Sequence, residues 1–103
     1  MSSLDYKEYR DKQLEDPEFR AEYEKLRPQY EFRRAVIGAR LEAGLTQKQL
    51  AEGMNTTQSA IARLEAGTRA PNLDTLLKLV EVLGVDLSIK QGGKVIMKPH
   101  RAA

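Results

Sequence analysis

Residues 45–67 read LTQKQLAEGMNTTQSAIARLEAG, and this stretch decides the fold because it carries the start and stop signals of two short helices. The first signal is a capping box formed by Thr46 and Gln49. In such a box the threonine side chain accepts from the backbone N–H three residues on, while the glutamine side chain reaches back. We therefore expect a short helix over residues 47–53.

The second helix follows after a short turn. Thr57 has the chemistry of an N-cap, and Gly67 is suited to close the helix, which predicts a helix over residues 58–66. Two short helices joined by a tight turn predict a helix-turn-helix unit.

The flanking sequence supplies two further helices. One is expected from Phe32 to Gly44, with an apolar face of Phe32, Val36, Ala39 and Ala43. The other starts after Pro71-Asn72 and ends at Gly84, with Leu73, Leu76, Leu77, Val80 and Leu83 on its buried side. The predicted core comprises Leu45, Leu50, Ala51, Ile61, Leu64, Leu76 and Leu79.

An acidic arm precedes this body. Residues 1–31 carry nine acidic and six basic side chains, residues 32–91 six and eight, and residues 92–103 none and three. Charged residues up to Glu15 are compatible with a helix, and Asp16-Pro17-Glu18 marks the start of another. Pro28 is expected to break or kink that helix, because it removes a backbone donor.

The last part changes to a period of two. Val85, Leu87 and Ile89 alternate with polar residues, Gly92-Gly93 suits a two-residue turn, and residues 95–97 follow as a second strand. Because an isolated hairpin is marginally stable in water, it should pack on the helices or pair with another chain. We favour pairing of the 85–89 strand with the same strand of a second subunit, so Val85, Leu87 and Ile89 are candidate dimerisation residues.

Composition excludes several classes of function. The 103 residues include no cysteine and a single histidine, His100, so we expect no metal and no cofactor. The carboxylates are scattered, which argues against an enzyme such as a small nuclease. No segment resembles a membrane span or a signal peptide, so a cytoplasmic location is expected.

The second helix of the unit carries the candidate base-reading residues. Its outward positions are Gln58, Ser59, Ala62 and Arg63. Glutamine can make two hydrogen bonds to adenine and arginine two to guanine, each pair contributing about 1–3 kcal/mol of discrimination. Alanine offers only apolar contact, as to a thymine methyl group.

The segments 45–52, 57–67 and 71–79 together resemble the Xre and Cro/C1 family of DNA-binding domains. The resemblance covers residues 32–84 and implies a mainly α fold: a five-helix helix-turn-helix domain, here with an N-terminal helical arm (1–31) and a C-terminal strand or hairpin (85–103). It also implies operator binding as a dimer, and an ion pair between Arg40 and Glu65 that is structural. Gln47 lies at a helix N-terminus, which favours phosphate, and the family glutamine at this position binds it. Weaker phosphate candidates are Thr46, Lys48, Thr57, Thr68 and Arg69.

The order of acidic arm and domain also resembles HigA-type antitoxins, which hold a basic ribonuclease toxin of the HigB/RelE-like kind and repress their own operon. That resemblance implies a toxin-binding surface on the arm, with Tyr9, Phe19, Tyr23 and Leu26 as candidates. Two alternatives stay open. The arm helix can instead pack back on its own domain, and the chain can instead be a stand-alone Xre-family regulator whose arm serves dimerisation or effector binding.

Overall fold

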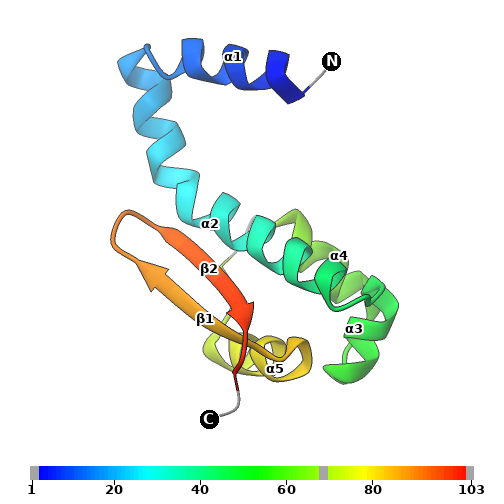
Figure 1. Ribbon diagram of the computed structural model, residues 1–103. Helices are drawn as coiled ribbons and strands as arrows, with labels where there is room; N and C mark the ends of the chain where they lie inside the picture. The colour runs from blue at the N-terminus through cyan, green and yellow to red at the C-terminus, as the bar shows by residue number, and fades with distance from the viewer. Residues whose placement is uncertain (1–2, 68–69, 102–103) are drawn as a thin grey trace.

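The computed structural model describes residues 3–67 and 70–101, and within them the chain is mainly helical with a C-terminal hairpin (Figure 1). The predicted fold class is confirmed. In chain order the elements are α1 (Ser3–Gln13), α2 (Pro17–Glu42), α3 (Gln47–Gly53), α4 (Gln58–Ala66), α5 (Leu73–Leu83), β1 (Val85–Lys90) and β2 (Lys94–Pro99).

Helix α2 is continuous from Pro17 to Glu42, so Pro28 does not break it, and of the predicted break or kink the break is wrong. Asp16 caps it as expected, accepting from the backbone N–H of Glu18 at 3.0 Å. The proline removes one helix hydrogen bond, but tertiary packing supports the helix across that point. A Cβ placed on Gly93 would lie 2.7 Å from Cγ of Pro28, so the hairpin turn closes directly on the proline ring. The boundary expected between residues 31 and 32 therefore falls inside one helix.

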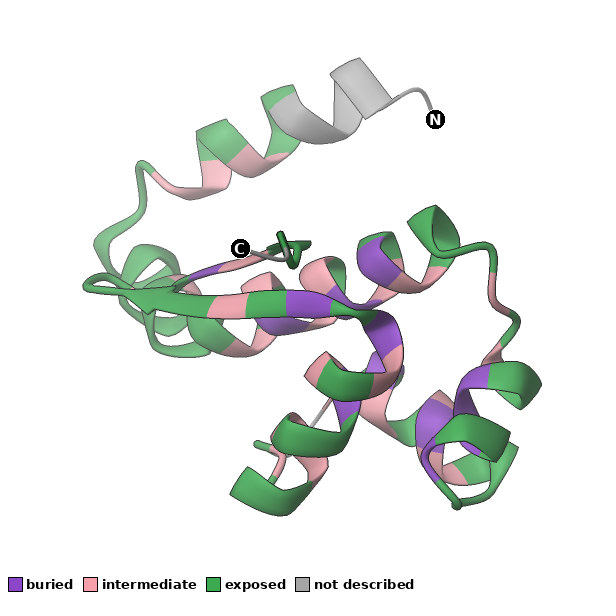
Figure 2. Ribbon diagram, turned by 60° about the horizontal axis from the view of Figure 1, so that its bottom comes forward, coloured by how far each residue is buried: buried purple, intermediate pink, exposed green. Residues whose placement is uncertain are grey.

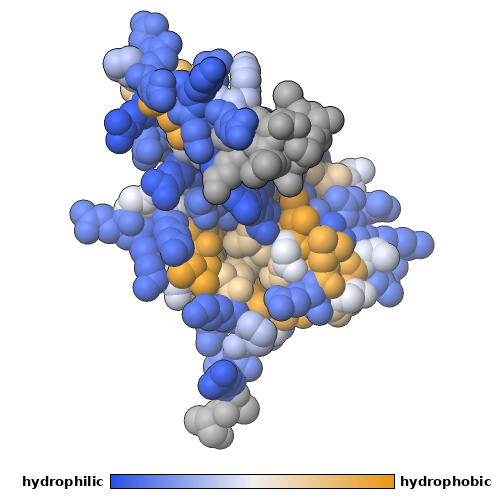
Figure 3. Space-filling view, turned by 45° about the horizontal axis from the view of Figure 1, so that its top comes forward, coloured by the Kyte–Doolittle hydropathy of each residue, from blue (hydrophilic) through white to orange (hydrophobic). Residues whose placement is uncertain are grey.

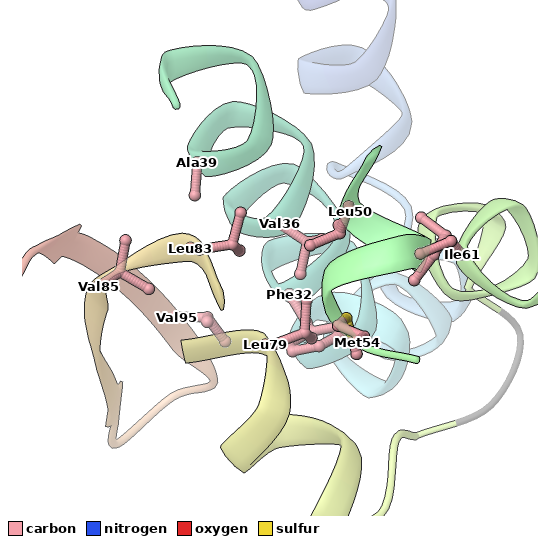
Figure 4. Packing of buried hydrophobic residues seen from close by; sticks show 11 residues of the cluster. Phe32, Val36, Ala39, Leu50, Met54, Ile61, Leu79, Leu83, Val85 and Val95 are labelled. Atoms are coloured by element: carbon pink, nitrogen blue, oxygen red, sulfur yellow. The ribbon is translucent and has the colours of Figure 1, made fainter. Parts of the chain in front are cut away.

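The hydrophobic core lies where the second half of α2 meets the other helices and the hairpin. Figure 4 shows side chains from all these elements pointing toward one another. The core comprises Phe32, Val36, Ala39, Leu50, Ala51, Met54, Ile61, Leu79, Leu83, Val85 and Val95. Of the predicted core residues, Leu50, Ala51, Ile61 and Leu79 are buried, and Leu45, Leu64 and Leu76 pack against the core while partly exposed.

Three residues expected on buried helix faces are exposed. Ala43 lies one residue beyond the end of α2, and Leu73 and Leu77 are 69% and 57% exposed. Helix α5 contacts the body along the side of Leu79 and Leu83, and the other two leucines lie on its outer edge. An apolar residue near a helix end or edge is therefore a poor guide to burial.

The C-terminal hairpin pairs within the chain. Its antiparallel register runs from Val85 opposite Pro99 to Lys90 opposite Lys94. This register leaves three residues, 91–93, in the turn, one more than predicted, and both of its glycines have positive φ. Val85 and Val95 are buried on the hairpin, where β2 contacts α2 and β1 contacts α5. In the described residues the sheet has two strands only, so one long edge of β1 has no strand beside it.

The arm, comprising α1 and the first half of α2 (residues 3–31), projects from the body (Figure 1). Figure 2 shows that the buried residues are confined to the body, while the arm is exposed or intermediate wherever its burial is described. No helix in the described ranges is long and apolar enough to cross a membrane.

Candidate nucleic-acid interface

Helices α3 and α4 form the helix-turn-helix unit, with the bounds that the sequence predicts. Both parts of the Thr46–Gln49 capping box are present, at 2.8 and 3.0 Å. The turn between the helices is anchored by Met54, which is buried, and by a hydrogen bond from Thr56 N–H to the carbonyl of Ala51 at 2.9 Å. The turn therefore fixes α4 against α3 through the core.

The candidate base-reading side chains lie on the outward side of α4. Gln58, Ser59 and Arg63 are exposed and Ala62 is half-buried, while Ile61 and Glu65 on the opposite side are buried. Thr57 caps the helix, accepting from the N–H of Ala60 at 3.1 Å. The polar side of α4 thus faces solvent, while its opposite side is buried against the rest of the domain.

Helix α4 is held in place by a buried polar network centred on Glu65. Arg40 of α2 donates from Nε to Glu65 Oε2 at 2.7 Å and from Nη2 to Oε1 at 3.0 Å, forming the expected ion pair. Its Nη1 donates to the carbonyl of Leu45 at 3.0 Å. The hydrogen bond with Glu65 raises the pKa of Arg40, and the negative charge of Glu65 raises it further. Burial acts in the opposite direction and lowers this pKa, but by less than the hydrogen bond raises it. The guanidinium therefore stays charged and ties α2 to α4.

Gln47, the candidate phosphate ligand, belongs to the same network. Its Nε2 donates to Oε1 of Glu65 at 3.2 Å, and the side chain is half-buried at the start of α3. This contact could not be predicted from the sequence, because Gln47 and Glu65 are 18 residues apart in the chain. Lys48 beside it is exposed, whereas Thr68 and Arg69 lie outside the described residues.

A second arginine of α2, which sequence reasoning missed, holds the end of α4. Arg33 Nη1 donates to the carbonyl of Ala66 at 2.8 Å. Its spacing of seven residues from Arg40 was the available signal, because residues i and i+7 share a helix face.

A hollow of about 840 Å³ lies beside α4, between the turn of the unit and the start of α5. Polar and basic side chains around it include Asn55, Arg63, Asn72 and Lys78. Lys78 also pairs with Asp74 on α5, with N–O at 3.2 Å. The rim of this hollow continues the outward face of α4, and its polar and basic side chains are of the kind that contact the phosphate backbone of DNA.

A family model described as helix-turn-helix, HTH_3, matches residues 38–90, which is half of the chain. The chain belongs to the helix-turn-helix family. The resemblance to Xre and Cro/C1 domains is thereby confirmed, and this family is one of DNA-binding regulators and not a class of enzymes.

Relatives of this helix-turn-helix protein match between about half and two thirds of its length. An uncharacterized HTH-type transcriptional regulator of Haemophilus influenzae is 46% identical over 54 residues, covering 52% of this chain and 55% of the relative. Endothelial differentiation-related factor 1 of Homo sapiens is 38% identical over 69 residues, which cover 67% of this chain and 47% of the relative. Multiprotein-bridging factor 1 of Candida albicans is 43% identical over 61 residues, which cover 59% of this chain and 40% of the relative. The chain thus spans about half the length of these relatives, and no solved structure matches it significantly.

The arm of this helix-turn-helix protein carries an aromatic stripe, which we define as Phe19, Tyr23, Leu26 and Tyr30. The rings of Phe19 and Tyr23 stack with centroids 6.4 Å apart, and those of Tyr23 and Tyr30 at 6.2 Å. Tyr23 is half-buried, and the other three are between 37% and 40% exposed. Tyr9 on α1, the fourth toxin-binding candidate, is 58% exposed and separate from the stripe. This face of the first half of α2 is therefore only partly exposed, with Tyr23 as its least exposed member.

Figure 3 shows that hydrophilic side chains gather over the arm. Of the candidate dimerisation residues, Val85 is buried in the core, Leu87 is half-buried and Ile89 is 64% exposed. The three side chains lie on one face of β1, and only Ile89, near the hairpin turn, is exposed on it.

Proposed function

We propose that this helix-turn-helix protein is a transcription regulator that binds operator DNA sequence-specifically as a dimer, with α4 in the major groove. One observation carries the proposal: the outward face of α4 is polar and exposed, while Arg40 and Glu65 clamp its inner face to α2. A groove-reading helix needs such a rigid mounting, because base contacts depend on a fixed register. The name of the Haemophilus relative, an HTH-type transcriptional regulator, supports regulation of transcription.

Base reading falls to four residues in this proposal. Gln58 and Arg63 are exposed and long enough to reach base edges, with adenine and guanine as their preferred partners. Ser59 has a hydroxyl that pairs with several bases, and Ala62 offers only a methyl group. The expected operator therefore has few strongly specified positions in each half-site.

Phosphate contacts would fix the register. In the described structure Gln47 uses one Nε2 proton on Glu65, which leaves the second for a phosphate oxygen. Thr46 and Thr57 accept from backbone amides at their helix starts, so their hydroxyl protons are free to donate. Lys48 supplies a positive charge beside them, and Thr68 and Arg69 remain candidates by sequence alone.

Dimerisation through the free edge of β1 suits the charges on that strand. An antiparallel pair of β1 strands centred on Ser88 would place Asp86 opposite Lys90 of the second copy, and Leu87 beside Ile89. This pairing covers the exposed Ile89 and matches two opposite charges. Val85 contributes from the core side, where it holds the strand in place.

A selection of binding sites from random duplex DNA tests the regulator proposal. The full chain should enrich a sequence with two-fold symmetry, whose half-sites lie one helical turn or a multiple of it apart. Enrichment of no sequence, or binding that is equal on all duplexes at physiological salt, would contradict the proposal.

The aromatic stripe favours a second function, that of an antitoxin. A helix presenting apolar rings within an acidic surround suits a basic protein with a hydrophobic groove, as a HigB/RelE-like ribonuclease toxin would provide. The experiment is co-purification with the product of an adjacent reading frame. Phe19→Ala with Tyr23→Ala should lose the partner, while Leu41→Ala, which removes an exposed side chain elsewhere on α2, should retain it. Equal capture by both variants would place the partner elsewhere, and absence of a partner would favour a stand-alone Xre-family regulator.

A further inference from the structure

Two arginines on one face of α2 hold the C-terminal end of α4. Arg40 binds the side chain of Glu65, and Arg33, seven residues earlier, donates to the carbonyl of Ala66. The last carbonyls of a helix lack partners within the helix, and a cation is favoured there by the helix dipole. Arg33 thus supplies both a donor and a positive charge where α4 ends.

The contact between Arg33 and the end of α4 is close. Gly67 caps α4 with a φ of +43°, and its N–H donates to the carbonyl of Arg63 at 2.9 Å. A Cβ added to Gly67 would collide with Cγ and Cδ of Arg33, so the stem of the arginine lies directly on the glycine backbone. The position of Arg33 and the geometry of the last turn of α4 are therefore linked.

The other side of Arg33 faces the arm. Its guanidinium carbon lies 4.7 Å from the centroid of the Tyr30 ring, within the range of a cation–π contact. Tyr30 is the last member of the aromatic stripe, and it stacks on Tyr23. An unbroken series of contacts therefore runs from the exposed stripe through Tyr30 and Arg33 to Ala66.

We propose that Arg33 is a positioning residue that couples the aromatic stripe to α4, so that a change at Tyr30 alters how firmly the last turn of α4 is held. That α4 reads DNA rests on the proposed function, but the coupling itself does not. Because Tyr30 is 40% exposed, anything seated on the stripe can contact this ring and so reach the end of α4. Contacts at the arm would then change DNA affinity without touching DNA.

Amide hydrogen exchange in the full chain tests the coupling, with the N–H of Gly67 as the reporter. Arg33→Ala should speed its exchange about three- to tenfold, as expected for the loss of one hydrogen bond to a charged donor. Tyr30→Leu, which keeps an apolar side chain, should speed it about two- to fivefold through loss of the cation–π contact. The N–H of Met54, bonded to the carbonyl of Leu50 in α3, is the internal reference and should not change.

The decisive comparison is a double-mutant cycle. If Tyr30 acts through Arg33, Tyr30→Leu has no further effect in the Arg33→Ala background. Arg34→Ala is the matched control, because Arg34 is exposed and next in sequence, and it should leave Gly67 unchanged. An unchanged Gly67 rate in Tyr30→Leu, or an equal effect of that change with and without Arg33, would overturn the proposal.

A DNA measurement separates this inference from the proposed function. On a duplex selected by the wild-type chain, Tyr30→Leu should weaken binding about two- to fivefold, Arg33→Ala at least as much, and Arg34→Ala less. If the wild-type chain selects no sequence, the proposed function fails, whereas the exchange cycle still decides whether the arm and α4 are coupled.

Discussion

Removal of the Glu65 side chain should be one of the most damaging single changes in the body of the protein. Glu65 is 5% exposed and accepts from Arg40 at 2.7 and 3.0 Å and from Gln47 at 3.2 Å. Glu65→Ala leaves the guanidinium of Arg40, which is 13% exposed, with the carbonyl of Leu45 as its remaining recorded partner. Breaking a buried pair from one side typically costs about 3–5 kcal/mol. Because Arg40 keeps one partner, we expect about 3 kcal/mol.

Urea unfolding followed by circular dichroism measures this loss. A cost of about 3 kcal/mol lowers the midpoint by about 1–3 M urea. Lys78→Ala is the control, since it removes an ion pair whose two side chains are 51% and 76% exposed and should cost less than about 1 kcal/mol. The double variant Arg40→Met with Glu65→Leu should recover most of the stability, because no charge is then left buried alone. The reasoning is refuted if Glu65→Ala costs no more than Lys78→Ala.

Three further predictions address the interface, the dimer and the hairpin. Gln47→Ala should weaken binding to all DNA sequences alike in a gel-shift series, and an altered sequence preference with intact affinity would count against its phosphate role. Asp86→Lys should weaken the dimer in analytical ultracentrifugation, and adding Lys90→Asp should restore it; no rescue would exclude the β1 pairing centred on Ser88. Gly92→Ala should cost about 1 kcal/mol of unfolding free energy, because its φ is 88°. Gly93→Ala should cost about 2–3 kcal/mol, because its Cβ also meets Pro28, and equal costs in thermal unfolding would contradict that contact.

Elements governed by local chemistry were predictable from the sequence. Helices α3 and α4 begin where Thr46 and Thr57 cap them, and the predicted bounds match the observed ones. A cap acts within three residues of itself, so its signal is complete in the sequence. The outward placement of Gln58 and Arg63 follows in the same way from the helical period.

Features that depend on distant parts of the chain were not predictable. Pro28 was expected to break or kink a helix, but the helix continues through it, and the turn at Gly93, far along the chain, packs on its ring. Similarly, the hydrogen bond from Arg33 to Ala66 joins residues that are 33 positions apart in the chain. In the hairpin, pairing of Lys90 with Lys94 sets a turn of three residues, which the Gly-Gly pair alone did not specify.

The long α2 explains how one small chain can serve two surfaces. Its second half supplies Phe32, Val36 and Ala39 to the core and the two arginines to α4, while its first half carries the aromatic stripe. Because the helix is continuous through Pro28, the stripe and the two arginines that contact α4 belong to the same helix.

The most direct test of the central claim compares the wild-type chain with the Gln58→Ala, Arg63→Ala variant on the selected duplex and on a scrambled duplex of equal length. The account predicts that the variant loses the preference for the selected duplex while keeping weak, salt-sensitive binding to both. If the variant distinguishes the two duplexes as well as the wild-type chain does, α4 does not read the DNA and the account is wrong.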